Sequence, residues 1–270
     1  MMRSLWSAAS GMISQQQNVD TIANNLANVN TTGYKKERME FKTLLYDMLR
    51  QADLDPANQT GRPVNLQIGL GVRPIAVAKI FTQGNLQRTD HYLDLAIEGD
   101  AFFVIQRGEE LTYSKDGTFK ISVGDGSTIV TAEGYPLVSV DGESIVVPAE
   151  VPVQDVSISE EGILTYIDAE GVTQDLGYQI ALVQFSNPQG LESIGANLLR
   201  QTTASGEPIY EADGDVAHPS RVLQGVMEMA NVQVAEEMVN LIVAQRAYDL
   251  NSKAITTSDE MLQTANNLKR

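Results

Sequence analysis

The chain of 270 residues contains two histidines and no cysteine. The absence of cysteine excludes a cysteine nucleophile, a thiolate zinc site, a disulfide and a Cys-x-x-Cys redox pair. His91 and His218 each lie beside a turn signal, and neither belongs to a His-Glu-x-x-His helix. The sequence also has no Gly-x-Ser-x-Gly nucleophile elbow. We interpret both histidines as surface residues and expect no catalytic residue.

Two short motifs resemble ligand sites, but each lacks a required residue. Gly69-Leu70-Gly71 begins like a dinucleotide loop, yet Pro74 stands where a third glycine is needed and no βαβ pattern surrounds it. The acidic residues of 211–215 alternate like calcium ligands, yet Val216 occupies the position of the glycine in a calcium loop. We therefore predict a turn and a solvated acidic loop, with no metal and no cofactor.

The N-terminal segment does not read as a targeting signal. Residues 1–13 are interrupted by Ser and Gly and run into the polar stretch 14–17. We expect no cleavable signal peptide, so the chain is either cytosolic or exported with its N-terminus intact. No apolar run approaches the ~18 residues that a membrane-spanning helix needs, and we expect no membrane insertion.

Charge separates the middle of the chain from its ends. The formal net charge is −16, and residues 90–215 hold 23 acidic residues against four basic ones. So acidic a chain disfavours binding to nucleic acid or to an anionic membrane. By contrast, Arg3 and Asp20 are the only charged residues among the first 30. A solvated helix carries more charge, so we expect this segment to be surrounded by protein.

Heptad spacing predicts a helix at each end of the chain. Near the N-terminus Leu5, Met12, Val19 and Leu26 lie seven apart, with Ala8, Gln15, Ile22 and Val29 three positions further on. At the other end Val234, Leu241, Tyr248, Ile255 and Leu262 predict a helix over 231–268. Polar seam residues such as Gln15, Gln245, Asn251 and Ser252 specify register and partners. An intramolecular coiled coil and contacts between subunits both fit this pattern.

Between the helices the apolar residues follow a period of two. Strands are expected at 95–97, 101–106, 118–123, 137–140, 144–147, 156–158, 163–167 and 178–185. Asp141-Gly142 predicts a tight hairpin turn, and Gly124-Asp125-Gly126 another turn. Residues 50–75, rich in Gly and Pro, are interpreted as an extended connecting segment. These strands suggest a sandwich or barrel-like domain.

The predicted fold class is α+β, in which long terminal helices pair as a coiled-coil-like core and carry an inserted all-β domain. Its parts are a terminal helical core at 1–30 and 231–270, a connecting region at 31–75 and 206–230, and an outer β domain at 76–205.

Four strings resemble the bacterial flagellar rod and hook family. They are TIANNLANVNTTGYK at 21–35, EEMVNLIVAQRAYDLNSKA at 236–254, DLAIEGDAFF at 94–103 and YSKDGTF at 113–119. Two more strings, LQIGLGVRP at 66–74 and GLESIG at 190–195, are similar to the distal-rod subfamily, and the proximal-rod subfamily is the nearest alternative. The resemblance covers nearly the whole chain and is weakest over 124–176.

The resemblance implies a structural subunit of the flagellar rod. Such a subunit is exported unfolded without a cleaved signal peptide, and it polymerises outside the cytoplasmic membrane into a rigid tubular drive shaft around the export channel. It implies as partners further copies of the chain, neighbouring rod and hook proteins, and ring proteins around the rod. The longer connecting region of the distal rod is associated with a straight shaft.

On this interpretation one set of residues carries assembly. It comprises Leu5, Met12, Val19, Ile22, Asn24, Asn25, Leu26, Asn28, Val234, Leu241, Tyr248, Ile255 and Leu262. Within this set Asn24, Asn25 and Asn28 set helix register, because amides bond across contacts without the desolvation cost of charges. Other classes stay open: an extracellular adhesin or lectin, a cytosolic coiled-coil scaffold and, last, an esterase-like enzyme.

Overall fold

The fold is described from a computed structural model, which describes residues 2–50, 53–54, 61–62, 65–123, 127–148, 151–152, 156–167, 173–214, 216 and 218–268. The chain divides into two compact units. Unit 1 comprises Met1–Ala27, Glu37–Ala78 and Gln233–Arg270, and unit 2 comprises Asn28–Lys36 and Lys79–Val232. Both units are therefore assembled from separate stretches of sequence.

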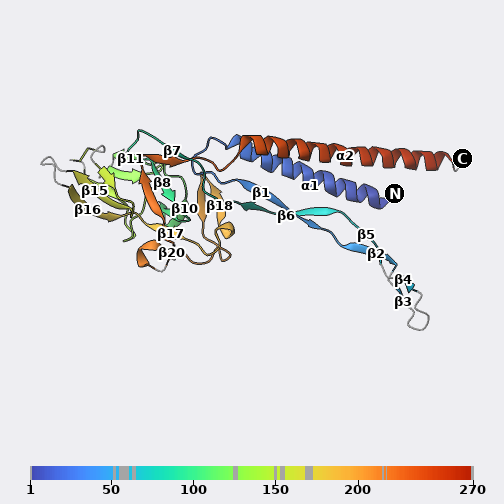
Figure 1. Cartoon of the computed structure of the whole chain (residues 1–270), viewed down its shortest axis with the longest axis horizontal. Coiled ribbons are helices and arrows are strands. Elements are labelled where there is room, and N and C mark those ends of the chain that lie inside the picture. Colours follow the sequence, from blue (N-terminus) through green and yellow to red (C-terminus); the bar gives the residue numbers. More distant parts are fainter. Residues whose placement is uncertain are drawn as a thin grey trace. The chain divides into compact units, whose positions relative to one another are not determined.

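Two long helices, α1 (Met2–Ala27) and α2 (Val234–Asn267), lie side by side in unit 1 (Figure 1). Both were predicted, and with the many strands they confirm the α+β class. Helix α2 begins three residues later than expected, because Gln233 is extended and the Asn231 side chain bonds the carbonyls of Ile80 and Thr82 in unit 2. Glu236 and Glu237 lie in its first turn, where the helix dipole favours acidic residues. The predicted basic end, Lys269-Arg270, lies outside the described residues.

The two helices meet through small and polar side chains. Ala8, Gly11 and Ser14 are buried on α1, and Glu237 and Ala244 on α2. A Cβ atom at Gly11 would lie 2.8 Å from the amide nitrogen of Asn251, so glycine allows the close approach there. Of the heptad positions on α1, Ala8 and Ile22 are buried, and Leu5, Met12, Val19 and Leu26 are half-buried. This seam therefore buries little apolar area.

The described residues of 37–79 form a two-stranded β-ribbon that we call the hairpin. Three strand pairs run along it: β1 (Glu37–Thr43) with β6 (Val72–Lys79), β2 (Tyr46–Arg50) with β5 (Leu66–Gly69), and β3 (Asp53–Leu54) with β4 (Gly61–Arg62) (Figure 1). The register of the second pair sets Tyr46 opposite Gly69 and Asp47 opposite Ile68. The described residues of the predicted extended segment 50–75 are extended, and the sequence analysis did not predict that they pair as strands. The Gly and Pro residues of this stretch are typical of loops, and for this reason the pairing of the strands on either side of them was not predicted.

A six-stranded antiparallel sheet forms the centre of unit 2. Its order is β18 (Glu192–Gly195), β19 (Leu198–Arg200), β10 (Glu110–Ser114), β9 (Phe102–Arg107), β17 (Leu182–Gln184) and β20 (Ile209–Tyr210). Unit 2 also contains two three-stranded sheets. The first consists of β11 (Lys120–Val123), β12 (Ser127–Val130) and β13 (Val146–Val147). The second consists of β14 (Val156–Ile158), β15 (Ile163–Ile167) and β16 (Thr173–Gln179). Two pairs complete it, β8 (Leu95–Glu98) with β21 (Arg221–Gln224) and β7 (Leu86–Arg88) with β22 (Val226–Glu228).

Strand β9 supplies both halves of the core of unit 2. Phe103 packs in one apolar cluster, where its ring meets Phe119 at 5.2 Å between centroids. Phe102 belongs to a second cluster and meets Phe185 at 5.9 Å. Successive side chains of a strand point to opposite faces, so both faces of β9 are covered. This explains why residues 101–105 form a continuous apolar run rather than an alternating one.

The strand predictions for unit 2 agree closely with the structure at β14 and β15, whose bounds match those expected. At Asp141-Gly142 the turn forms with Gly142 at φ +83°, and Ser139 N donates to Glu143 O at 2.8 Å. The flanks make an isolated Val138–Ser144 bridge instead of two full strands. The predicted turn at 124–126 lies outside the described residues.

We expect Phe103→Ala to destabilise unit 2 by about 3–5 kcal/mol, because it removes a fully buried ring and leaves a cavity. The matched control is Leu111→Ala in the same sheet, whose side chain is exposed and whose loss changes stability by less than about 0.5 kcal/mol. Urea unfolding followed by circular dichroism measures both. Equal effects of the two variants would contradict this account of the core.

Candidate assembly interface

Large apolar side chains are exposed almost exclusively in unit 1. Among the described residues 23 such side chains are exposed, and 21 of them lie in unit 1; the two in unit 2 are Tyr92 and Leu111. Unit 2 has an apolar core of its own, whereas unit 1 buries few large side chains. Extended apolar exposure of this kind marks a surface that another molecule covers.

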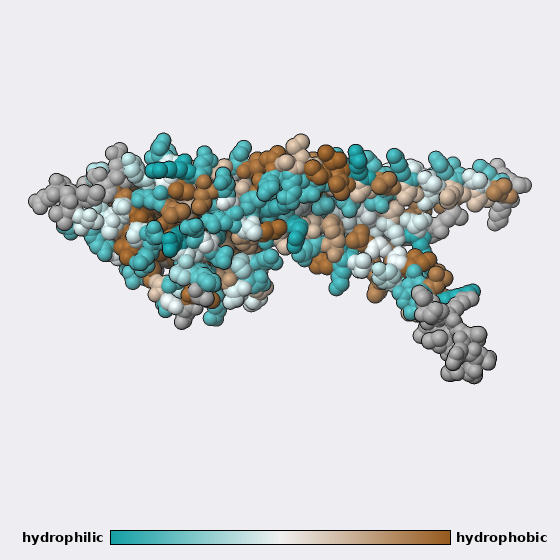
Figure 2. Space-filling view, viewed as in Figure 1, coloured by the Kyte–Doolittle hydropathy of each residue, from teal (hydrophilic) through white to brown (hydrophobic). Residues whose placement is uncertain are grey.

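One part of this surface is a cluster at the start of α2, which we call the α2 patch: Val234, Met238, Val239, Ile242 and Val243. Figure 2 shows it as brown atoms over the first turns of α2. These side chains are between 43% and 61% exposed and carry no charge. The positions extend well beyond one narrow stripe of the helix, which indicates contact with more than one neighbouring element.

The other part is the hairpin. Ten of its large apolar side chains are exposed: Phe41, Leu45, Tyr46, Met48, Leu49, Leu66, Ile68, Leu70, Ile75 and Val77. An isolated two-stranded ribbon is at best marginally stable in water and needs a further layer. The hairpin therefore has the composition of an element that is buried only in an assembly.

The residues predicted to carry assembly occupy different environments. Ile22 and Asn25 are buried; Leu5, Met12, Val19, Leu26, Asn28, Leu241, Ile255 and Leu262 are half-buried; Asn24, Val234 and Tyr248 are exposed. The seven-residue stripe Leu5, Met12, Val19, Leu26 is thus half-buried along its whole length. The α2 patch apart from Val234, and the apolar residues of the hairpin, were missed by the sequence analysis. The high proportion of apolar residues in 234–243 could have indicated the α2 patch.

Asn25 connects three elements of unit 1. Its side-chain amide donates to the Glu37 carbonyl at 2.8 Å and accepts from Glu37 N at 2.8 Å, which ties α1 to the start of β1. The same amide nitrogen lies 3.2 Å from Glu237 Oε2 in the first turn of α2. This supports the expectation that the amides of the 21–35 string fix register, here between α1, α2 and the hairpin.

The next residues of that string, 28–36, belong to unit 2, and we call them the strap. Gly33 adopts φ +66°, and its N–H donates to Glu228 O at 2.8 Å. A Cβ atom at Gly33 would lie 2.6 Å from Asp116 N, so no other residue fits without a shift of backbone. Thr32 donates to Asp116 Oδ1 at 3.0 Å, and its carbonyl accepts from the Asn197 side chain at 2.9 Å.

A buried ion pair holds the strap to strand β22. Lys35 Nζ lies 2.6 Å from Glu228 Oε1, and the two side chains are 4% and 1% exposed. Lys35 also donates to Thr82 O at 2.9 Å, and Glu228 Oε1 accepts from Gly84 N at 2.7 Å. Removing one member of a buried pair leaves an uncompensated charge and typically costs about 3–5 kcal/mol.

A second lysine, Lys115, is buried close to this pair. Its ammonium donates to Gly99 O at 2.6 Å and lies 5.1 Å from the centre of the Phe102 ring. Burial, together with repulsion from Lys35, lowers the pKa of Lys115 to about 8, although Glu228 and Asp100 act in the opposite direction. Burial likewise raises the pKa of the Tyr113 hydroxyl to about 12. Burial is the main cause of both pKa shifts, and we assign neither group a catalytic role.

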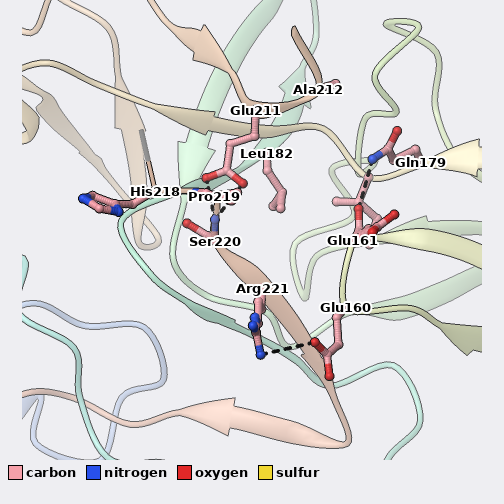
Figure 3. Close-up of a pocket in the computed structure, with 11 residues that line it drawn as sticks. Glu160, Glu161, Gln179, Leu182, Glu211, Ala212, His218, Pro219, Ser220 and Arg221 are labelled. Carbon is pink, nitrogen blue, oxygen red and sulfur yellow. Dashed lines mark hydrogen bonds and ion pairs between the residues drawn. The ribbon is translucent and has the colours of Figure 1, made fainter. Parts of the chain in front are cut away.

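A polar depression of about 710 Å³ in unit 2 has no catalytic arrangement (Figure 3). Glu211 accepts from Ser220 N at 3.0 Å, and Glu160 pairs with Arg221 at 3.5 Å, so these carboxylates serve structural bonds. The imidazole of His218 points away from Glu160 and Glu161 (Figure 3). His91 and His218 are exposed, as expected.

The predicted acidic loop forms a short turn at Glu211–Asp213, and Asp215 is not among the described residues. Within the described part of the chain no group of three or more candidate metal ligands occurs. No helix in that part has the length and apolarity to cross a membrane.

We expect Gly33→Ala to unfold or strongly destabilise unit 2, because the new Cβ meets the backbone of Asp116 at a left-handed φ. Gly108→Ala is the matched control: Gly108 has the same φ of +66° but nothing within 4 Å of the added Cβ. Both variants carry the same backbone strain, so the difference between their thermal unfolding midpoints measures the clash of the new Cβ with Asp116. A Gly33 variant no less stable than the control would contradict the proposed seating of the strap.

Lys115 predicts a pH dependence of stability. The pKa of Lys115 in the folded chain, about 8, lies below the ordinary lysine pKa of 10.5, so the unfolded chain binds more protons between these values and stability rises with pH there. From pH 7.5 to 9.5 the gain is about 2 kcal/mol. Lys115→Met removes this gain, which urea unfolding at both pH values measures. An identical pH response in both proteins would refute the assignment.

Family profiles match three parts of the chain. "Flagella basal body rod protein" matches residues 5–35, which cover most of α1 and nearly all of the strap. "Flagellar hook protein FlgE/F/G D1 domain" matches residues 96–166 of unit 2. "Flagellar basal body rod FlgEFG protein C-terminal" matches residues 223–268, which include Glu228 and all of α2.

Several relatives match over the full length. The chain is 48% identical over 272 residues to the flagellar basal-body rod protein FlgG of Borreliella burgdorferi, and 40% identical over 270 residues to that of Bacillus subtilis, with all of each chain covered. It is 30% identical over 277 residues to the flagellar hook-basal body complex protein FlhP of Bacillus subtilis, again with both chains fully covered. The chain therefore belongs to the FlgG family of flagellar basal-body rod proteins.

Proposed function

We propose that this chain is the structural subunit of the flagellar distal rod, located in the basal body outside the cytoplasmic membrane. Copies polymerise into a rigid tubular shaft that transmits torque from motor to hook and lines the export channel. The observation that carries the proposal is the exposed apolar surface of unit 1, present in a chain with full-length FlgG relatives. Localising a tagged chain to purified hook-basal bodies tests it.

In this proposal the terminal helices of neighbouring copies pack together as a coiled-coil-like core. The half-buried stripe Leu5, Met12, Val19, Leu26 on α1 and the α2 patch supply the apolar contacts between copies. Burying such side chains is worth about 1.5–3 kcal/mol each. Leu241, Tyr248, Ile255 and Leu262 contribute to the same assembly contacts, and Asn24, Asn25 and Asn28 set helix register. The predicted division into helical core, connecting region and outer β domain applies to this assembled form.

Unit 2 forms the outer tube in this proposal. It covers its own apolar residues, and residues 90–215 supply most of its acidic charge. Neighbouring rod and hook proteins contact the ends of the shaft, and ring proteins surround it. The chain acts without catalysis or cofactor, which is supported by the engagement of Glu160 and Glu211 in structural bonds.

A second candidate is another axial subunit of the same family, such as a proximal rod protein of the FlgF type. Two of the matched family profiles describe FlgE, FlgF and FlgG together, which favours this alternative. Deletion of the gene distinguishes them: loss of the distal rod alone supports the first candidate, and loss of the proximal rod supports the second.

We expect Leu26→Asp to abolish rod assembly and motility while unit 2 stays folded, because it places a charge on the half-buried stripe of α1. Leu26→Met is the matched control and keeps motility, since it preserves volume and apolarity. Swimming assays and basal-body purification measure the outcome. A motile Leu26→Asp strain would sink the proposed role of this stripe.

A further inference from the structure

Within unit 1 a heptad line of α1 faces a heptad line of α2. Three pairs of facing residues lie on it: Ser4 with Ser258, Gly11 with Asn251, and Asn25 with Glu237. On each helix successive members of these pairs are seven and then fourteen positions apart, and their numbers rise along α1 as they fall along α2. The helices are therefore antiparallel and keep one register over the whole contact (Figure 1).

The same spacing adds a fourth pair to the line. Asn18 lies seven residues after Gly11, and Ala244 lies seven residues before Asn251, so this register sets Asn18 opposite Ala244. Ala244 is buried and Asn18 is half-buried, in agreement with a position on the contact. Two neighbouring pairs thus combine one amide with one small residue, and the amide comes from α2 in one pair and from α1 in the next.

The small residue of such a pair makes room for the amide. A Cβ atom at Gly11 would lie 2.8 Å from Asn251 Nδ2 and 3.1 Å from its Cγ, so the glycine accommodates the whole head of the asparagine side chain. Small side chains offer only shallow steric barriers to sliding. The pairing of amides with small residues therefore decides which register is the most stable one.

A shift of one heptad in either direction removes this pairing. In one direction Asn18 meets Asn251, and two amides compete for the space of one. In the other direction Gly11 meets Ala244, and the two small residues leave a gap. The observed register is the one that avoids both the crowding and the gap.

A buried carboxylate favours the same register. Glu237 is 1% exposed and lies 3.2 Å from Asn25 Nδ2. Asn25 is itself held in place, because its side chain bonds both the N–H and the carbonyl of Glu37 at the start of β1. A shift of one heptad separates Glu237 from Asn25, and a buried charge that loses a hydrogen-bond donor is destabilised.

We propose that this line of eight residues, which we call the register line, fixes the position of α2 along α1, and that Gly11 and Asn251 are its specificity-determining pair. A shift of one heptad moves α2 by about 10.5 Å along α1. It moves the α2 patch by the same distance relative to the half-buried stripe of α1, and so changes the surface that the helix pair presents. The register is a property of one chain, whereas its effect on assembly rests on the polymeric function proposed above.

Exchange of the two side chains tests the specificity-determining pair. Gly11→Asn places a second amide against Asn251 and lowers assembly about tenfold. Gly11→Asn/Asn251→Gly restores assembly, because the amide and the small residue have only changed sides, as they do at Asn18 and Ala244. The matched control, Gly11→Asn/Asn240→Gly, has the same composition but changes an exposed asparagine of α2, and it restores nothing. Basal-body purification and swimming assays measure assembly.

Engineered disulfides report the register directly, because the chain has no cysteine of its own. In Ser4→Cys/Ser258→Cys the thiols replace hydroxyls whose oxygens lie 3.5 Å apart, so a small movement reaches the S–S length of ~2.0 Å. Ser4→Cys/Ala265→Cys is the control, because position 265 faces position 4 only after a shift of one heptad. We expect the first pair to bond and the second not to bond, both in the purified chain and in basal bodies, read as faster migration on non-reducing gels.

The two tests are combined in the purified chain. Gly11→Asn lowers the yield of the 4–258 disulfide, and further addition of Asn251→Gly restores it. Three results overturn the proposal: a 4–265 disulfide that forms as readily as the 4–258 one, a 4–258 disulfide absent from both preparations, or an exchange that does not restore its yield. Absence of the unmodified chain from basal bodies contradicts the polymeric function instead, and the disulfide yields of the purified chain still test the register.

Discussion

The buried pair of Lys35 and Glu228 is the interaction on which the seating of the strap in unit 2 depends. Lys35 lies in the last part of the strap, two residues before β1, and Glu228 ends β22, six residues before α2. The pair thus joins the strap to strand β22 within unit 2. Thr82 O accepts from Lys35 and Gly84 N donates to Glu228, and these bonds offset part of the cost of burying the two charges.

The two units differ in how much of their apolar surface they bury. Unit 2 places consecutive aromatic residues of β9 in two clusters and leaves only Tyr92 and Leu111 exposed among its described large apolar residues. Unit 1 joins its helices through small residues and leaves the α2 patch and the hairpin uncovered. Unit 2 thus buries its own apolar residues, whereas unit 1 leaves many of them exposed. This difference suits the polymerising subunit proposed above, in which other copies cover unit 1.

The sequence predicted what depends on local periodicity. The heptads located both helices to within a few residues, and the alternation at 156–158 and 163–167 located β14 and β15. It did not predict the strap contacts, because 193 residues separate Lys35 from Glu228 and no local pattern marks the pair. The hairpin was missed because apolar residues occupy both of its faces, which removes the period of two. The burial of Gly11 was not predicted, because it follows from the close approach of Asn251 and not from apolarity.

The seam of small and polar residues between α1 and α2 has a mechanical consequence. Interlocked large side chains resist sliding through steric barriers, whereas Gly11 facing Asn251 and Ser4 near Ser258 offer shallow ones. If copies assemble into the shaft proposed above, its stiffness is a collective property of the contacts between copies, and a twisting load is distributed over many of them.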